Sequence, residues 1–274
     1  MSAASATSDR LIAGTQTVLL RAFTWLVYAF LIAPIVLIVL MALNAGELLE
    51  FPPRGISLRW FVALYHSEQF MNAIATSLQI AIIAMAVSGI LGTAAALYFV
   101  RFSRRFSEPL RLLLLAPLLL PEILSAIALL FFLYEIGLGN QWGIGLQIGH
   151  ILVTMPYVFL NVTSSLYNLD SSLEQAARSL GAGWWTTFRR VTLPLIKPGL
   201  FAGCLFAFVI SFDLFAMSLL LKGIGQVPLP VQLYDYLRWD FDPIAAAVSS
   251  VSILMTLVIV LLTDRIVGLR ALRF

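Results

Sequence analysis

Residues 171–200, SSLEQAARSLGAGWWTTFRRVTLPLIKPGL, form a polar, arginine-bearing segment between two of the most apolar runs of the chain. Ser171 and Glu174 have the spacing of a capping box, in which each side chain satisfies a free backbone N–H, so we expect a helix to begin here. Apolar residues then recur at spacings of three or four, which places them on one helix face: Leu173, Ala177, Leu180, Trp184, Phe188 and Val191. The segment is therefore predicted to be helical and amphipathic.

Two glycines and two prolines predict where this helical segment breaks and ends. Gly181 and Gly183 are poor helix formers and are expected to divide it into two short helices that meet at an angle. Pro194 and Pro198 are expected to end the second piece before the next apolar run begins.

The sequence around this segment is apolar enough to cross a membrane several times. Of the 274 residues, 61% are hydrophobic and 11% charged, which is more apolar surface than a globular core of this size can bury. A membrane-spanning helix needs roughly 20 apolar residues. Six runs reach that length, at residues 18–43, 73–99, 109–134, 145–168, 198–221 and 243–263. We therefore expect an all-α membrane protein with six transmembrane helices and no soluble domain.

Basic residues predict the orientation of these helices, because Lys and Arg accumulate in cytoplasmic loops. If the N-terminus is cytoplasmic, only four of the 17 basic residues fall in outer segments: Arg54, Arg59, Lys222 and Arg238. This bias favours cytoplasmic N- and C-termini and places residues 171–194 in a cytoplasmic loop between the fourth and fifth helices. The net charge of +3 follows from this topology and gives no indication of nucleic-acid binding.

The predicted organisation has four parts. Residues 1–17 form a cytoplasmic N-terminal tail whose composition predicts mobility, and residues 18–72 hold the first transmembrane helix and an outer loop. Residues 73–265 form a core of five transmembrane helices, and residues 266–274 form a cytoplasmic C-terminal tail. The first apolar run is too long for a signal-peptide core, so we expect it to be retained as a helix.

No residue cluster in the sequence indicates a catalytic or metal centre. Cys204 is alone within an apolar run, which excludes an internal disulfide and disfavours a thiolate metal site. His66 and His150 lie in or near outer loops and are expected to be solvated or interfacial. The glycine-rich loop that binds ATP phosphates is missing. A membrane-embedded enzyme is therefore the weaker alternative, because such enzymes usually show paired aspartates, a serine with a lysine, or clustered histidines.

Two roles are open for residues 171–194. The segment would lie among the lipid headgroups, with its arginines on phosphates, or it would seat its apolar face in a groove of a partner and transmit a push to both flanking helices. The residues alone leave both interpretations open.

A motif in this segment resembles the cytoplasmic loop of ATP-binding-cassette (ABC) importer permeases. The signature of that family reads Glu-Ala-Ala, three residues, Gly, nine residues, Ile, one residue, Leu-Pro. The chain matches it in register at five positions: Ala176, Ala177, Gly181, Leu193 and Pro194. Val191 stands for the isoleucine, and the glutamate position holds Gln175 with Glu174 beside it. The charged contact that the family makes there is therefore expected to be shifted or weakened.

Four more stretches resemble the second permease subunit of polyamine-type importers. They are FPPRGISLRWF at 51–61, LLPEI at 119–123, SFDLFAMSLLL at 211–221 and LPVQLYDYLR at 229–238. The resemblance implies a type I ABC importer permease in the inner (plasma) membrane, surrounded by lipid. It also implies three kinds of partner: a second permease subunit, two cytoplasmic ATPase subunits that bind the ATP, and an extracytoplasmic solute-binding protein.

The same resemblance assigns residues 171–194 as the coupling loop that sits in a cleft of the ATPase. Seven residues are the implied contacts: Glu174, Gln175, Ala176, Ala177, Gly181, Leu193 and Pro194. The chain itself is expected to bind no cofactor and to catalyse no reaction.

Glu122 and Asp213 are acidic residues inside apolar runs. A charge at the centre of a span costs on the order of 2.5–3.5 kcal/mol on insertion scales, so it usually faces a partner or a water-filled cavity. Either each carboxylate is paired with another helix or subunit, or both line an electronegative pathway for a cation. Pro117 and Pro121 also predict that the third helix is bent or partly opened beside Glu122. The resemblance favours the pathway, because polyamine-type permeases bind a linear cation through carboxylates and aromatic rings.

Three tyrosines near the outer ends of the spans are further candidates. Tyr134, Tyr234 and Tyr236 would form an outer gate, because amine cations favour aromatic faces, although tyrosines at membrane boundaries are more often anchors. The function we expect is the import of a small organic cation, above all a polyamine, by alternating access. An aminophosphonate, ferric ion, opine or amino-acid-like solute is the alternative cargo on the same scaffold.

Overall fold

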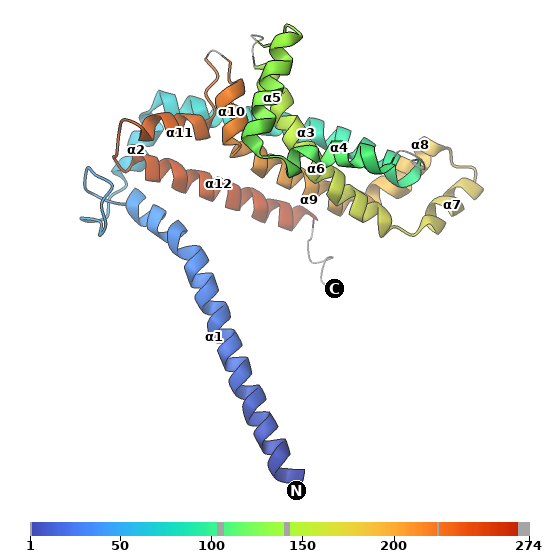
Figure 1. The fold of residues 1–274 in the computed structure, drawn as a ribbon, viewed down its shortest axis with the longest axis horizontal. Coiled ribbons are helices and arrows are strands. Elements are labelled where there is room, and N and C mark those ends of the chain that lie inside the picture. The colour runs from blue at the N-terminus through green and yellow to red at the C-terminus, as the bar shows by residue number, and fades with distance from the viewer. Residues whose placement is uncertain (1, 103–106, 140–142, 224, 268–274) are drawn as a thin grey trace. The chain divides into compact units, whose positions relative to one another are not determined.

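The computed structural model describes residues 2–102, 107–139, 143–223 and 225–267, and these are almost entirely helical (Figure 1). The elements in chain order are α1 (Ser2–Ala42), α2 (Arg59–His66), α3 (Glu68–Arg101), α4 (Ser107–Leu119), α5 (Glu122–Glu135), α6 (Ile144–Tyr167), α7 (Ser171–Ser179), α8 (Trp184–Thr187), the π-helix η1 (Phe188–Thr192), α9 (Leu193–Phe212), α10 (Phe215–Leu221), α11 (Leu229–Leu237) and α12 (Ile244–Val267).

The prediction of six membrane-spanning segments is confirmed if a bent pair of helices counts as one span. Five continuous helical stretches of the described residues are long and apolar enough to cross a membrane, and α4 with α5 forms the bent pair. The first, second, fourth and sixth predicted runs fall in α1, α3, α6 and α12. Helix α1 begins at Ser2 and so includes the predicted N-terminal tail, whereas residues 268–274 of the predicted C-terminal tail lie outside the described residues.

The third span is broken, as its prolines predict. Helices α4 and α5 lie at 111° to each other, and Figure 1 shows α5 turning sharply away from α4. Pro121 has no N–H to continue the helix, and it disfavours a helical conformation at Leu120. Glu122 consequently begins α5 instead of lying midway along a continuous helix.

The expected end of the loop helix at Pro194 and Pro198 is wrong. Residues Trp184–Phe212 form one continuous helical stretch through α8, η1 and α9. The Leu193 N–H donates to the Phe188 carbonyl, five residues earlier, so the turn before Pro194 is a wide π turn that accommodates a proline ring and its missing N–H.

The predicted fifth run, 198–221, is interrupted near its C-terminal end. Helix α9 ends at Phe212, Leu214 is extended with ψ 102°, and α10 begins at Phe215. Asp213 therefore lies at a helix break, beside a cavity that it lines.

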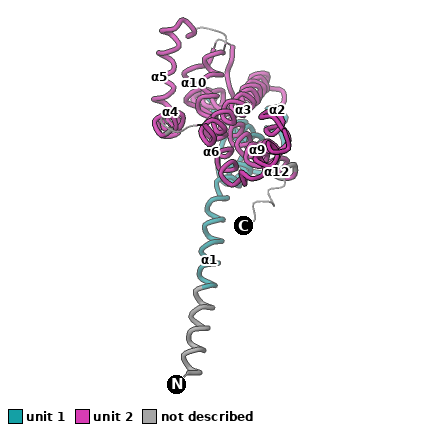
Figure 2. The backbone as a smooth tube through the Cα atoms, turned by 90° about the vertical axis from the view of Figure 1, so that its right-hand side faces the viewer, with its two compact units in different colours: residues 1–64, 240–252 teal, residues 65–239, 253–274 magenta. Residues whose placement is uncertain are grey.

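The chain forms two compact units, shown in Figure 2, of which the first comprises residues 1–64 and 240–252. Its buried residues Ala42, Ala246 and Ala247 contact the Trp60 ring. Asn44 organises the adjoining loop, because its carboxamide oxygen accepts from the N–H groups of Gly46 and Arg54, both at 2.9 Å. The Trp60 indole N–H donates to the Asn44 carbonyl at 3.0 Å.

The second unit comprises residues 65–239 and 253–274, and α3, α6 and α9 form its centre. Small residues let these helices approach closely. A Cβ added at Gly92 of α3 would lie 2.8 Å from the Val158 Cβ on α6, and one added at Gly203 of α9 would lie 2.8 Å from the Val158 Cα. Both helices therefore pack directly against the α6 backbone.

We expect Gly92→Val to destabilise the second unit by about 1–3 kcal/mol, because the new side chain has to push α3 away from α6. The measurement is the melting temperature of the purified protein in detergent micelles. Gly183→Val is the matched control, since a Cβ there meets no atom within 4 Å and its φ of −68° suits any residue. Equal melting temperatures for Gly92→Val and the unmodified chain would contradict the close α3–α6 contact.

Candidate functional site

The start of the 171–194 loop is capped by a different residue than the sequence predicts. The Ser172 N–H donates to the Asp170 carboxylate at 2.9 Å, and this bond holds the pKa of Asp170 below its usual value. Asp170 is therefore the N-cap of α7, and the predicted Ser171–Glu174 capping box is wrong. Glu174 turns into the protein instead, where it has stronger partners than a backbone N–H.

The break between the two loop helices is confirmed at Gly181. Its φ of +85° is a left-handed conformation that favours glycine. The Gly181 N–H donates to the Arg178 carbonyl at 2.9 Å, and the Ala182 N–H donates to the Ala177 carbonyl at 3.0 Å. This pair of bonds is a Schellman motif, which satisfies the last carbonyls of α7 and turns the chain towards α8.

The apolar side of the loop is exposed. Leu180 is 89% exposed, and the rings of Trp184 and Trp185 are also largely accessible. The Trp184 ring stacks on Phe188 with centroids 5.8 Å apart. The loop therefore presents an apolar surface that the other described residues of the second unit do not cover.

The seven predicted coupling residues divide into two groups. Four of them are exposed: Gln175, Ala176, Gly181 and Pro194. Ala177 and Leu193 are half-buried, and Glu174 is buried. A partner that seats on this loop would thus meet the amide of Gln175, the small Ala176 and the apolar side chains, whereas the Glu174 carboxylate faces inward.

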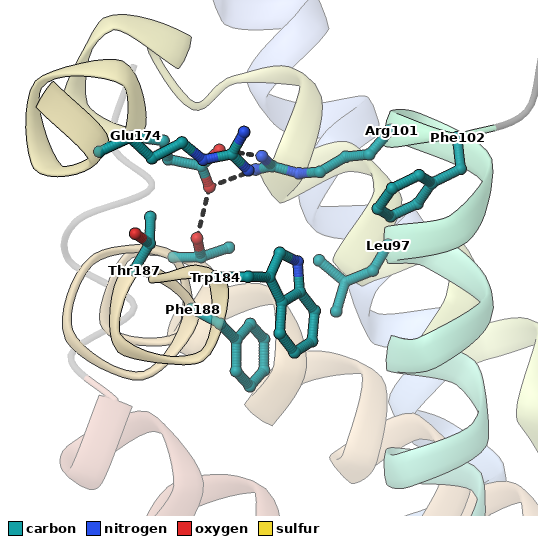
Figure 3. Close-up of a pocket in the computed structure, with 9 residues that line it drawn as sticks. Leu97, Arg101, Phe102, Glu174, Trp184, Thr187 and Phe188 are labelled. Carbon is teal, nitrogen blue, oxygen red and sulfur yellow. Dashed lines mark hydrogen bonds and ion pairs between the residues drawn. The ribbon is translucent and has the colours of Figure 1, made fainter. Parts of the chain in front are cut away.

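Glu174 binds Arg101, one of the 13 basic residues that the predicted topology places on the cytoplasmic side. The two guanidinium NH₂ groups of Arg101 donate to both carboxylate oxygens of Glu174, and the Thr192 hydroxyl donates to one of them (Figure 3). Arg101 ends α3, Glu174 lies in α7 and Thr192 ends η1. The only signal in the sequence was a basic residue at the end of an apolar run.

The second candidate region is a cavity of about 390 Å³ in the second unit. Glu122 and Asp213, the two intramembrane acids, both line it, together with Tyr157. The Glu122 carboxylate also accepts the Met217 N–H at 3.0 Å, in the first turn of α10. The structure therefore brings the two predicted acids together at the two helix breaks.

Tyr157 was missed by the sequence analysis. It lies in α6, directly after Pro156, and its ring stacks on Phe206 of α9 with centroids 6.4 Å apart and planes 19° apart. This contact fixes the ring at the wall of the cavity. A tyrosine beside a proline in the middle of an apolar run was the available signal, since tyrosines used as anchors lie near the ends of spans.

The three predicted gate tyrosines do not line this cavity. Tyr134 is exposed near the end of α5. Tyr234 lies against Phe215, with centroids 5.2 Å apart, and Tyr236 lies against Phe70 at the same distance. The rings of Tyr234 and Tyr236 thus contact other aromatic rings of the chain, and none of the three tyrosines lines the cavity with Glu122 and Asp213.

His150 is buried, so the expectation that it is solvated or interfacial is wrong. Its side chain lies in α6 and is 1% exposed. Nδ1 lies 2.8 Å from the Ser211 hydroxyl, and Nε2 lies 3.1 Å from the Ser218 hydroxyl. The imidazole thus connects α6 to both sides of the break at Asp213.

Comparisons with known proteins agree with this architecture. Residues 88–273 match the family described as binding-protein-dependent transport system inner membrane component. The putrescine transport system permease protein PotI of Escherichia coli K12 is 32% identical over 222 residues, which are 79% of each chain. The spermidine/putrescine permease PotC of Haemophilus influenzae is 30% identical over 249 residues, covering 90% of this chain and 95% of PotC.

A solved structure shares the fold. A chain of the bacterial alginate ABC transporter, in complex with its alginate-bound periplasmic protein, superposes with a TM-score of 0.71 at 19% identity and 94% coverage of both chains. The family and its relatives are transport permeases, which confirms the prediction that the chain is not an enzyme. The chain belongs to the inner-membrane permease components of binding-protein-dependent ABC importers.

Proposed function

We propose that the chain carries a small organic cation, above all a polyamine, into the cytoplasm by alternating access. The observation that supports this most directly is the cavity at the two helix breaks, which Glu122, Asp213 and Tyr157 share. Irregular backbone inside a membrane is tolerated where it faces protein or a water-filled space, which is what a solute pathway requires.

The chemistry of this cavity suits an amine. None of the described residues that line it is basic, so the two carboxylates are available for a cationic ligand. The ring of Tyr157 adds an aromatic face to which an ammonium group is attracted. A volume of about 390 Å³ is within the usual range of small-molecule sites, and the putrescine and spermidine/putrescine permeases are relatives by sequence.

The 171–194 loop is the proposed contact with a cytoplasmic ATPase. With both termini in the cytoplasm, α7 and α8 lie on the cytoplasmic side, and their exposed apolar surface around Leu180 and Trp184 fits a groove of a partner. ATP-driven closure of the ATPase pair would then favour one arrangement of the helices over the other. Only such a difference in binding free energy can shift the population of inward- and outward-facing states.

Neutralising the cavity acids tests the substrate class. In proteoliposomes that contain the whole transporter and its binding protein, we expect Glu122→Gln and Asp213→Asn each to lower putrescine or spermidine uptake about tenfold, because each removes a charge–charge contact. Glu108→Gln, an exposed residue of α4 outside the cavity, is the matched control.

The cargo is compared in the same vesicles. Uptake of an aminophosphonate in place of polyamines would favour the alternative solute class. Polyamine uptake that is indifferent to both substitutions would contradict a cation pathway through this cavity.

A charge on the exposed loop tests the ATPase contact. We expect Leu180→Asp to abolish co-purification of the ATPase subunits with the permease, because a carboxylate cannot enter an apolar groove without losing its hydration. Ile56→Asp is the control, since Ile56 is similarly exposed, at 87%, but lies in the loop before α2. Normal ATPase binding by Leu180→Asp would contradict the assignment of this loop as the ATPase contact.

A further inference from the structure

The ion pair between Arg101 and Glu174 connects two helices that are distant in the sequence. It is bidentate, since each NH₂ group of the guanidinium meets its own carboxylate oxygen. The Glu174 side chain is 5% exposed and the Arg101 side chain is 22% exposed. A planar fork of this kind fixes the distance and also the relative orientation of its partners.

Thr192 makes the connection three-way. Its hydroxyl donates to the Glu174 oxygen that also receives an Arg101 NH₂ group, and Thr192 is itself buried. A single carboxylate thus joins the end of α3, the first turns of α7 and the π-helix that leads into α9. In Figure 3, dashed lines join the Glu174 carboxylate to the Arg101 guanidinium.

The surroundings of the pair indicate a mechanical joint and not a ligand site. Leu97 of α3, Phe102 directly after α3, and the stacked Trp184 and Phe188 rings line the same small space. Its volume is about 20 Å³, which is enough for about one water molecule. Low local dielectric strengthens the electrostatic attraction, so the joint resists extension.

A buried ion pair adds little net stability, because the loss of hydration offsets much of its attraction. Its role here is to fix the position of α7 relative to α3. The chain already connects α7 to α6 through residues 168–170 and to α9 through α8 and η1. It provides no comparable direct connection from α7 to α3, which packs against both α6 and α9.

We propose that the Arg101–Glu174–Thr192 cluster is the strut through which movement of the coupling loop reaches α3. Glu174 is then a positioning residue inside the permease and not a contact of the ATPase. This inference rests on the proposed function of the loop. It adds that a push on α7 moves α3, α6 and α9 together, so that the helices around the cavity change state as one body.

The test separates binding of the ATPase from transmission of its movement. Arg101→Ala, Glu174→Gln and the double variant are purified with all partner subunits, and uptake per ATP hydrolysed is measured in proteoliposomes. We expect each single variant to retain the ATPase and to lose about tenfold in this ratio, within the usual range of coupling between sites. The double variant should lose no more than either single one, because all three break the same strut.

Two further variants keep the result interpretable. Thr192→Val removes one hydrogen bond without unpairing a charge, and we expect a smaller loss of the same kind. Arg21→Ala is the control, since Arg21 is an exposed arginine at the predicted cytoplasmic end of another span and should change nothing. If the Arg101 and Glu174 variants fail to assemble with the partner subunits, Thr192→Val alone decides the inference.

The outcomes distinguish the inference from the proposed function. Loss of ATPase co-purification in Glu174→Gln would overturn the strut and identify Glu174 as a contact residue, while leaving the loop's function intact. Unchanged uptake per ATP in all variants, or additive losses in the double variant, would also overturn the strut. Failure of Leu180→Asp to release the ATPase would instead remove the proposed function on which it rests.

Discussion

The hydrogen bond from the Met217 N–H to the Glu122 carboxylate joins the two places where the membrane helices of this chain break. Each unsatisfied backbone group in hydrocarbon costs several kcal/mol, so a broken helix needs a substitute for its missing partners. Glu122 begins α5 after the break at Leu120, and it satisfies a free N–H in the first turn of α10, after the break at Asp213. One side chain thus connects the two helix ends that border the cavity.

Much of the fold follows from local properties of the sequence. The second, fourth and sixth spans agree with their apolar runs to within a few residues, because length and hydrophobicity alone decide them. Pro121 likewise predicts a bend, although not its angle of 111°. The end of the loop helix was predicted wrongly, because a π turn accommodates Pro194, and the break at Asp213 depends on contacts that α9 and α10 make with α5 and α6.

The candidate site was predictable one residue at a time but not as an arrangement. Glu122 and Asp213 were recognisable because an acid in an apolar run requires an explanation. Arg101 and His150 each have an ordinary local interpretation, as a topology charge and an interfacial side chain, and Tyr157 is a single tyrosine within an apolar run. Only their partners, which lie far away in the sequence, change that interpretation.

The neighbouring residues Glu174 and Gln175 show how the loop separates two tasks. Consecutive side chains on a helix point about 100° apart, so the two cannot serve the same contact. The charge occupies the buried position, where a low dielectric makes its bonds to Arg101 and Thr192 strong and directional, and the exposed position carries a neutral amide. Recognition of a partner at this surface then depends on shape and on the apolar side chains around Leu180, while the charge holds α7 in the orientation in which that surface is presented.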